Sequence, residues 1–170
     1  MPNATAIAGV SPSHDTTITT FWPSVAANPL GRIIGSICNC IPIKINGIAI
    51  SAILFALPLA PLAALIYLLM KVFGTRYVLT RKSLSSWSST GQQLYKSIPL
   101  TDIDDIRINE QGGQAFYRAA DLEIMATDGA ILMKLGGLSH PKTARQIILE
   151  TRQAALETAA SLETIQKRAK

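Results

Sequence analysis

The sequence predicts an α+β protein in which an N-terminal membrane helix or helical hairpin precedes a small β domain, and a long C-terminal helix closes that domain. Residues 45–70 contain no charged side chain, which is typical of a membrane span. Residues 76–135 alternate apolar and polar side chains in short runs between turn residues, as half-buried strands do. Residues 142–170 contain neither glycine nor proline, which favours one long helix.

The uncharged run is long enough to cross a bilayer. The hydrocarbon core of a bilayer is about 30 Å thick and a helix rises about 1.5 Å per residue, so roughly 20 apolar residues suffice. We therefore expect a transmembrane helix at about residues 46–71. Pro58 and Pro61 lie inside this run and predict a bend, because each removes a backbone hydrogen-bond donor.

A second apolar stretch at residues 30–43 precedes the expected span. Such a helix covers only about 21 Å, which is less than the bilayer core. We favour a helix that lies at the interface or is partly inserted, and the first leg of a hairpin is the alternative. The whole membrane segment then covers residues 29–72, and residues 1–28 are interpreted as a flexible N-terminal leader.

Four basic residues follow the expected span, namely Lys71, Arg76, Arg81 and Lys82. The positive-inside rule then predicts that the β domain faces the cytoplasm from the inner membrane. The net charge is +5, but cations and anions are nearly balanced across residues 71–140. Without a basic face or a nucleic-acid-binding motif, we expect no nucleic-acid partner.

The β domain is expected at residues 75–136, with six to seven strands. Its clearest turn signal is the Asp128-Gly129 pair between two alternating runs, which predicts a hairpin. The closing helix is expected at residues 139–168, with Pro141 at its first helical position.

One apolar face of the closing helix extends beyond the length that short strands can cover. This face is formed by Ala155, Ala159, Leu162 and Ile165, which recur at three- and four-residue intervals. Because no surface within the domain is available to bury it, we interpret it as a face for a partner helix.

The order of these parts, together with four short motifs, resembles that of a known family. The motifs are Arg-Tyr-Val-Leu-Thr at residues 76–80, Ile-Pro-Leu-x-Asp-Ile at 98–103, Ala-Asp-Leu at 120–122 and Leu-Gly-Gly at 135–137. In this pattern the chain resembles the bacterial PH-like (pleckstrin-homology-like) membrane proteins over roughly residues 20–150. The resemblance implies a split β-barrel of two bent sheets closed by a C-terminal helix. It transfers no catalytic residue, because its motifs are strand and turn elements.

The candidate catalytic and metal-binding groups do not form a recognised pattern. Asp102, Asp104 and Asp105 lack the glycine and glutamate spacing of an EF-hand loop. His14 and His140 have no accompanying ligand set, and nucleotide-binding motifs are absent from the sequence. We therefore expect no catalytic residue, no metal and no cofactor.

The sequence thus favours a non-catalytic, membrane-anchored adaptor or scaffold that binds a protein partner or a second copy of the chain. A lipid-headgroup-sensing module is the first alternative, in which Lys71, Arg76, Arg81 and Lys82 contact anionic membrane lipid. An accessory subunit of a membrane enzyme or transporter is the second.

Overall fold

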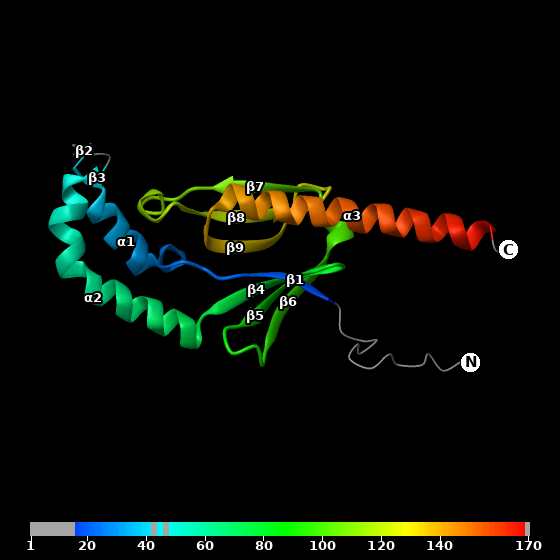
Figure 1. Cartoon of the computed structure of the whole chain (residues 1–170), viewed down its shortest axis with the longest axis horizontal. Helices are drawn as coiled ribbons and strands as arrows, with labels where there is room; N and C mark the ends of the chain where they lie inside the picture. Colours follow the sequence, from blue (N-terminus) through cyan, green and yellow to red (C-terminus); the bar gives the residue numbers. More distant parts are fainter. Residues whose placement is uncertain (1–15, 42–43, 46–47, 169–170) are drawn as a thin grey trace.

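The computed structural model describes residues 16–41, 44–45 and 48–168 of the chain. Two antiparallel sheets face each other across a core, a pair of helices projects from one end of them, and one long helix runs along the second sheet (Figure 1). The free end of that long helix points away from the helix pair.

The first sheet has the strand order β1-β4-β5-β6. Its first strand lies upstream of the helix pair, in a threonine-rich segment where the sequence analysis placed no strand, and it pairs with β4 through Phe21 and Tyr77. Threonine and phenylalanine both favour extended backbone, which explains this strand. The four strands are β1 (Thr17–Phe21), β4 (Thr75–Thr80), β5 (Ser83–Ser88) and β6 (Leu94–Pro99).

The second sheet has the strand order β7-β8-β9. The hairpin between β8 and β9 confirms the turn predicted at Asp128 and Gly129. Gly129 has a φ of +81°, and the Ala130 amide donates to the Asp128 carboxylate at 2.9 Å. The strands are β7 (Asp105–Asn109), β8 (Ala119–Met125) and β9 (Ile131–Ser139).

The predicted split β-barrel is wrong, because the two sheets are separate and unclosed. Between β6 and β7 the chain turns through the 3-10 helix η2 (Leu100–Asp102), so no strand continues from one sheet into the other. At the gap between β6 and β9, the Lys96 ammonium donates to the Leu132 carbonyl in place of a strand ladder. The Gly136 amide donates to the Tyr77 hydroxyl at 3.1 Å, which also links the sheets.

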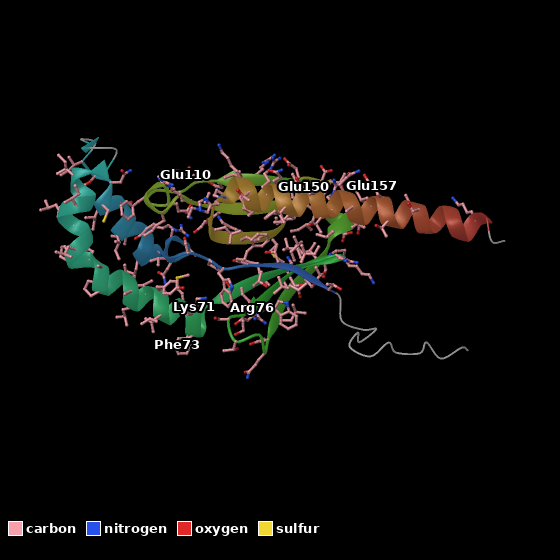
Figure 2. The ribbon with its side chains drawn as sticks, in the orientation of Figure 1. Lys71, Phe73, Arg76, Glu110, Glu150 and Glu157 are labelled. Atoms are coloured by element: carbon pink, nitrogen blue, oxygen red, sulfur yellow. The ribbon has the colours of Figure 1, made fainter. Side chains whose placement is uncertain are left out.

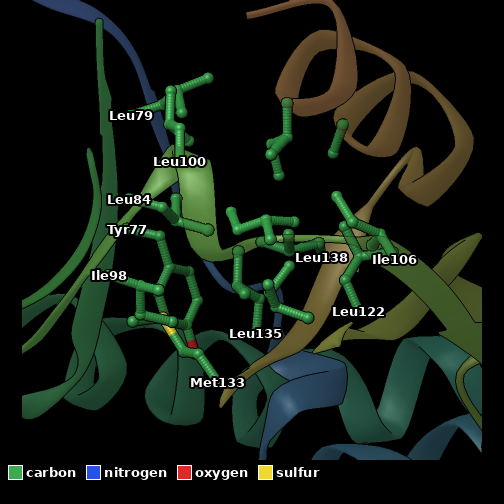
Figure 3. Close-up of a cluster of buried hydrophobic side chains, with 14 residues drawn as sticks. Tyr77, Leu79, Leu84, Ile98, Leu100, Ile106, Leu122, Met133, Leu135 and Leu138 are labelled. Atoms are coloured by element: carbon green, nitrogen blue, oxygen red, sulfur yellow. The ribbon is translucent and has the colours of Figure 1, made fainter. Parts of the chain in front are cut away.

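Apolar side chains from both sheets and the long helix fill the core (Figure 3). The long helix, α3 (Pro141–Arg168), inserts Ala144 and Ile148 between them. Arg145 of α3 donates to the Asp105 carboxylate at 2.9 Å, so an ion pair holds the helix beside β7. The principal core residues are Tyr77, Leu79, Leu84, Ile98, Leu100, Ile103, Ile106, Leu122, Ile124, Met133, Leu135 and Leu138.

The helix pair consists of α1 (Pro29–Cys38) and α2 (Ile50–Phe73). The two helices pack through a small apolar cluster that contains Ile34, Cys38 and Ile66. The Ser51 hydroxyl donates to the Cys38 carbonyl at 2.7 Å, which joins the end of α1 to the start of α2.

The expected transmembrane helix at residues 46–71 is wrong, and so is the inner-membrane location that depended on it. Among the helices of the described residues, none has the length and apolarity that crossing a membrane requires. The uncharged run does not form one helix. Its first residues instead belong to the short strands β2 (Lys44–Ile45) and β3 (Ile48–Ala49), which pair with each other before α2 begins.

Candidate binding surfaces

The helix pair exposes a large set of apolar side chains, which we call the helical apolar surface. Leu57 is 83% exposed and Phe73 is 79% exposed, although both are large hydrophobic residues. Figure 2 shows Phe73 at the end of α2 that adjoins the sheets. The surface comprises Leu30, Ile33 and Ile37 of α1 and Ile53, Leu54, Leu57, Leu62, Leu65, Leu68, Leu69, Val72 and Phe73 of α2.

This surface covers most of the circumference of α2. With about 3.6 residues per turn, the positions that pack toward α1, including Leu59, Ile66 and Met70, fall within roughly a third of the circle. The exposed positions occupy roughly the remaining two-thirds. The helix α1 therefore covers only one face of α2, and the rest of the circumference stays exposed.

An aromatic and basic cluster marks the sheet end of this surface. The Lys71 ammonium lies 3.9 Å from the centroid of the Trp22 ring and 6.0 Å from that of Tyr67. The Ser89 hydroxyl donates to the Lys71 carbonyl, which ties the end of α2 to the first sheet. A small cavity of about 230 Å³ lies between these side chains.

The four basic residues proposed from the sequence as lipid contacts do not form one cluster. Lys71 lies in the last turn of α2, and Arg76 lies at the start of β4 with its guanidinium against Gly91 (Figure 2). Arg81 and Lys82 form the turn at the other end of β4, about 16 Å along the strand from Arg76. The structure therefore divides this set between two ends of the sheet.

Arg81 and Lys82 instead lie beside the helix face that the sequence analysis assigned to a partner. A groove of about 800 Å³, which we call the α3 groove, separates them from α3. Ala155 and Ala159 belong to its helical wall, whereas the side chains of Leu162 and Ile165 lie outside the described part of the chain. The groove is lined by Ile18, Arg81, Lys82, Leu100, Thr101, Glu150, Thr151, Ala154, Ala155, Thr158 and Ala159.

A buried carboxylate that the sequence analysis did not single out organises the second sheet. Asp121 is fully buried and accepts hydrogen bonds from the Gly137 amide at 2.7 Å and the Gln114 side chain at 2.6 Å. Lys134 pairs with it at 3.2 Å. Burial alone raises the pKa of Asp121, but these hydrogen bonds and the lysine outweigh that effect and hold the pKa below its ordinary value.

The same network fixes α1 to the second sheet. Arg32 donates to the Ala26 carbonyl at 3.1 Å and to the side-chain oxygen of Gln111. Gln111 in turn donates to Asp121 at 3.2 Å. The signal available in the sequence was the lone charge of Arg32 in an apolar stretch, because a half-buried cation there needs specific hydrogen-bond partners.

The aspartates considered as metal ligands have structural roles. Asp105 pairs with Arg145, and Arg152 approaches Asp104 at 4.0 Å. A backbone hydrogen bond from Ile106 and the Arg145 guanidinium lower the pKa of Asp105. Within residues 16–41, 44–45 and 48–168, no three metal-ligating side chains gather at one point.

We compared the chain with models of protein families, with curated proteins and with solved structures, and found no match to any of them. The assignment to the PH-like family thus stays a prediction.

Proposed function

We propose that the protein is a non-catalytic adaptor that binds lipid through the helical apolar surface and presents its sheets and α3 to a protein partner. The proposal concerns contact between one surface and the apolar part of a lipid layer. The observation that carries it is the exposed apolar arc over roughly two-thirds of α2. Exposed apolar surfaces of this extent mark sites of contact with lipid or with another protein.

The position of the helix pair at one end of the sheets supports the proposed lipid contact. Figure 1 shows that the start of α1 and the end of α2 both adjoin the sheets, whereas the strands β2 and β3 lie at the far end. The helix pair can therefore lie against an apolar layer while the sheets stay in water. Trp22, Tyr67 and Lys71 then lie at the boundary, where aromatic and basic side chains are favoured.

Burial of these apolar side chains in lipid contributes favourable free energy to the contact. Full burial of a leucine or isoleucine side chain contributes about 1.5–3 kcal/mol, so burying four of them supplies about 6–12 kcal/mol before the costs of association. The two helices that carry these side chains already pack against each other through a separate apolar cluster. Binding consequently requires little additional ordering of the backbone.

Vesicle flotation of the full chain tests the proposal. We expect the wild type to float with phosphatidylcholine vesicles, because the contact is apolar and needs no anionic headgroup. The double variant Leu57→Glu/Leu68→Glu places two charges on the surface and should lose flotation. Leu94→Glu is the matched control, because Leu94 is an exposed leucine on β6, away from the helix pair.

Two results would overturn the lipid assignment. In the first, the wild type sediments without the vesicles, or the double variant floats as well as the wild type. In the second, light scattering shows a stable oligomer that does not bind vesicles and that Leu57→Glu/Leu68→Glu dissociates. A second copy of the chain would then cover the surface.

A further inference from the structure

The α3 groove is a second open apolar feature, at a distance from the helical apolar surface. Its helical wall carries small side chains, Ala154, Ala155, Thr158 and Ala159, and its other walls include Ile18 of β1 and Leu100 of η2. Figure 1 shows α3 extending past the sheets at this end. Its volume of about 800 Å³ lies within the range of about 300–1,000 Å³ that is typical of ligand pockets.

The helical wall is suited to another helix. Ala155 and Ala159 are four residues apart and therefore lie on one face of α3, one turn above the other. Side chains this small allow a second backbone to approach closely, at the short end of the usual distances of about 8–10 Å between helix axes. The apolar side chains of a bound helix would pack against Ala155 and Ala159 inside the groove.

The charged residues on the rim of the groove indicate which side chains a bound helix would carry along its edge. Arg81 and Lys82 are exposed, and no ion pair joins either of them to an acidic group in the described part of the chain. The acidic residue of the groove, Glu150, already accepts a hydrogen bond from Gln146 at 2.7 Å. The rim thus offers two cations to an incoming ligand.

We propose that the α3 groove binds an amphipathic helix of a partner protein, with small or branched apolar residues on its inner face and aspartate or glutamate along the edge that meets Arg81 and Lys82. This is the helix-in-groove mode of recognition. The inference deepens the adaptor role proposed above and rests on it. It uses residues separate from those that contact lipid.

Charge argues against a second copy of α3 as the occupant. Along α3 the basic residues Arg145 and Arg152 are interspersed with Glu150 and Glu157, so a second copy would bring cations as well as anions to the rim. Like charges brought together at an interface disfavour the complex. An acidic partner helix satisfies the same groove without that repulsion.

Selection from a displayed peptide library tests the proposal. The library fixes helix-forming backbone positions, places alanine, leucine or isoleucine on one face, and varies the flanking edges among aspartate, glutamate, lysine and arginine. The target is the full chain bound to phosphatidylcholine vesicles or held in mild detergent. We expect the wild type to enrich peptides with acidic edges, by at least about tenfold over their basic counterparts, which corresponds to about 1.4 kcal/mol.

Two variants and one control sharpen this test. Arg81→Glu/Lys82→Glu should reverse the preference, so that peptides with lysine or arginine edges are enriched. Ala155→Phe fills the groove and should remove enrichment of either class. Lys142→Glu changes an exposed cation at the start of α3 and should select the same peptides as the wild type.

The proposal is wrong if the wild type enriches no peptide, if enriched peptides show no acidic bias, or if Arg81→Glu/Lys82→Glu leaves that bias unchanged. It is also wrong if the double charge variant abolishes flotation with anionic vesicles, because the rim would then contact lipid. Flotation with phosphatidylcholine is measured on the same variants. Its failure for the wild type overturns the lipid proposal alone, whereas a failed selection with normal flotation overturns only the groove assignment.

Discussion

The helices α2 and α3 have similar lengths, 24 and 28 residues, and each buries one face against its neighbours, but their opposite faces differ completely. On α2 the outer face is made of leucine, isoleucine, valine and phenylalanine. On α3 it carries pairs such as Gln146 with Glu150 and Gln153 with Glu157, whose side chains hydrogen-bond along the helix at 2.7 and 2.8 Å.

This difference indicates that the two outer faces suit different surroundings, whereas the inner faces both reflect packing within the fold. The outer face of α3 is suited to water, because its polar side chains form hydrogen bonds with one another or with solvent. The outer face of α2 is not suited to water, because exposure of apolar leucine side chains to water is unfavourable. The four predictions below test this contrast, in order of decreasing effect.

The largest effect on stability is expected from Ile148→Ala in α3. Ile148 is fully buried in the core, so removing its side chain leaves a cavity and should lower the free energy of unfolding by about 2–5 kcal/mol. Leu57→Ala in α2 should change it by less than about 0.5 kcal/mol, because Leu57 is 83% exposed. Urea unfolding followed by circular dichroism measures both. Equal costs would mean that the outer face of α2 is buried in the isolated protein.

The second effect is expected at the carboxylate that connects the helix pair to the sheet. Asp121→Asn brings an amide donor against the Gly137 amide and the Gln114 side chain, and should cost about 1–3 kcal/mol at neutral pH. Because folding lowers the pKa of Asp121, the wild type gains stability above the ordinary aspartate pKa and loses it as the pH falls through the folded value.

The pH dependence of unfolding checks the role of Asp121 separately from its absolute cost. Between neutral pH and strong acid, the stability of Asp121→Asn should fall less steeply than that of the wild type. Parallel curves for the two proteins would show that Asp121 does not contribute to the acid sensitivity of the fold.

A third effect is expected where α1 meets the loop before β8. A Cβ atom at Gly35 would lie 2.2 Å from the Gly113 carbonyl oxygen, so Gly35→Ala forces α1 away from this loop. We expect a loss of about 1–3 kcal/mol in unfolding free energy. Gly112→Ala is the matched control, because a Cβ there meets nothing within 4 Å. If the two variants are equally stable, α1 is not held by this close approach.

The smallest effect is expected from the contact at the end of α2. A double-mutant cycle with Lys71→Ala and Trp22→Ala should give a coupling of about 0.5–1 kcal/mol, the usual value for a cation over an exposed ring. A coupling of zero would indicate that the interaction between the two side chains contributes nothing to stability.

The sequence predicted the parts of the fold that depend on local patterns. The hairpin at Asp128 and Gly129 and the helix that starts at Pro141 follow from turn and capping chemistry, which a few neighbouring residues determine. The strand at Thr17–Phe21 was missed because threonine-rich segments have the composition of linkers as well as of strands.

The errors concern features that depend on distant contacts. Whether two sheets close depends on which strand edges meet, and a pattern of alternation within each strand is silent on that point. The length of an uncharged run likewise does not reveal that its first residues pair as β2 and β3. The α3 groove is another feature that depends on distant contacts, because Arg81 and Ala155 line it together only in the folded chain.

The pairing of β1 with β4 has a consequence for the architecture of the chain. These strands are hydrogen-bonded neighbours, and the whole helix pair is inserted between them. Because Phe21 lies opposite Tyr77, the two ends of the insert meet at one sheet edge, as the two ends of a hairpin loop do. The helix pair thus occupies the place of an enlarged hairpin loop, and the pairing of β1 with β4 holds both of its ends.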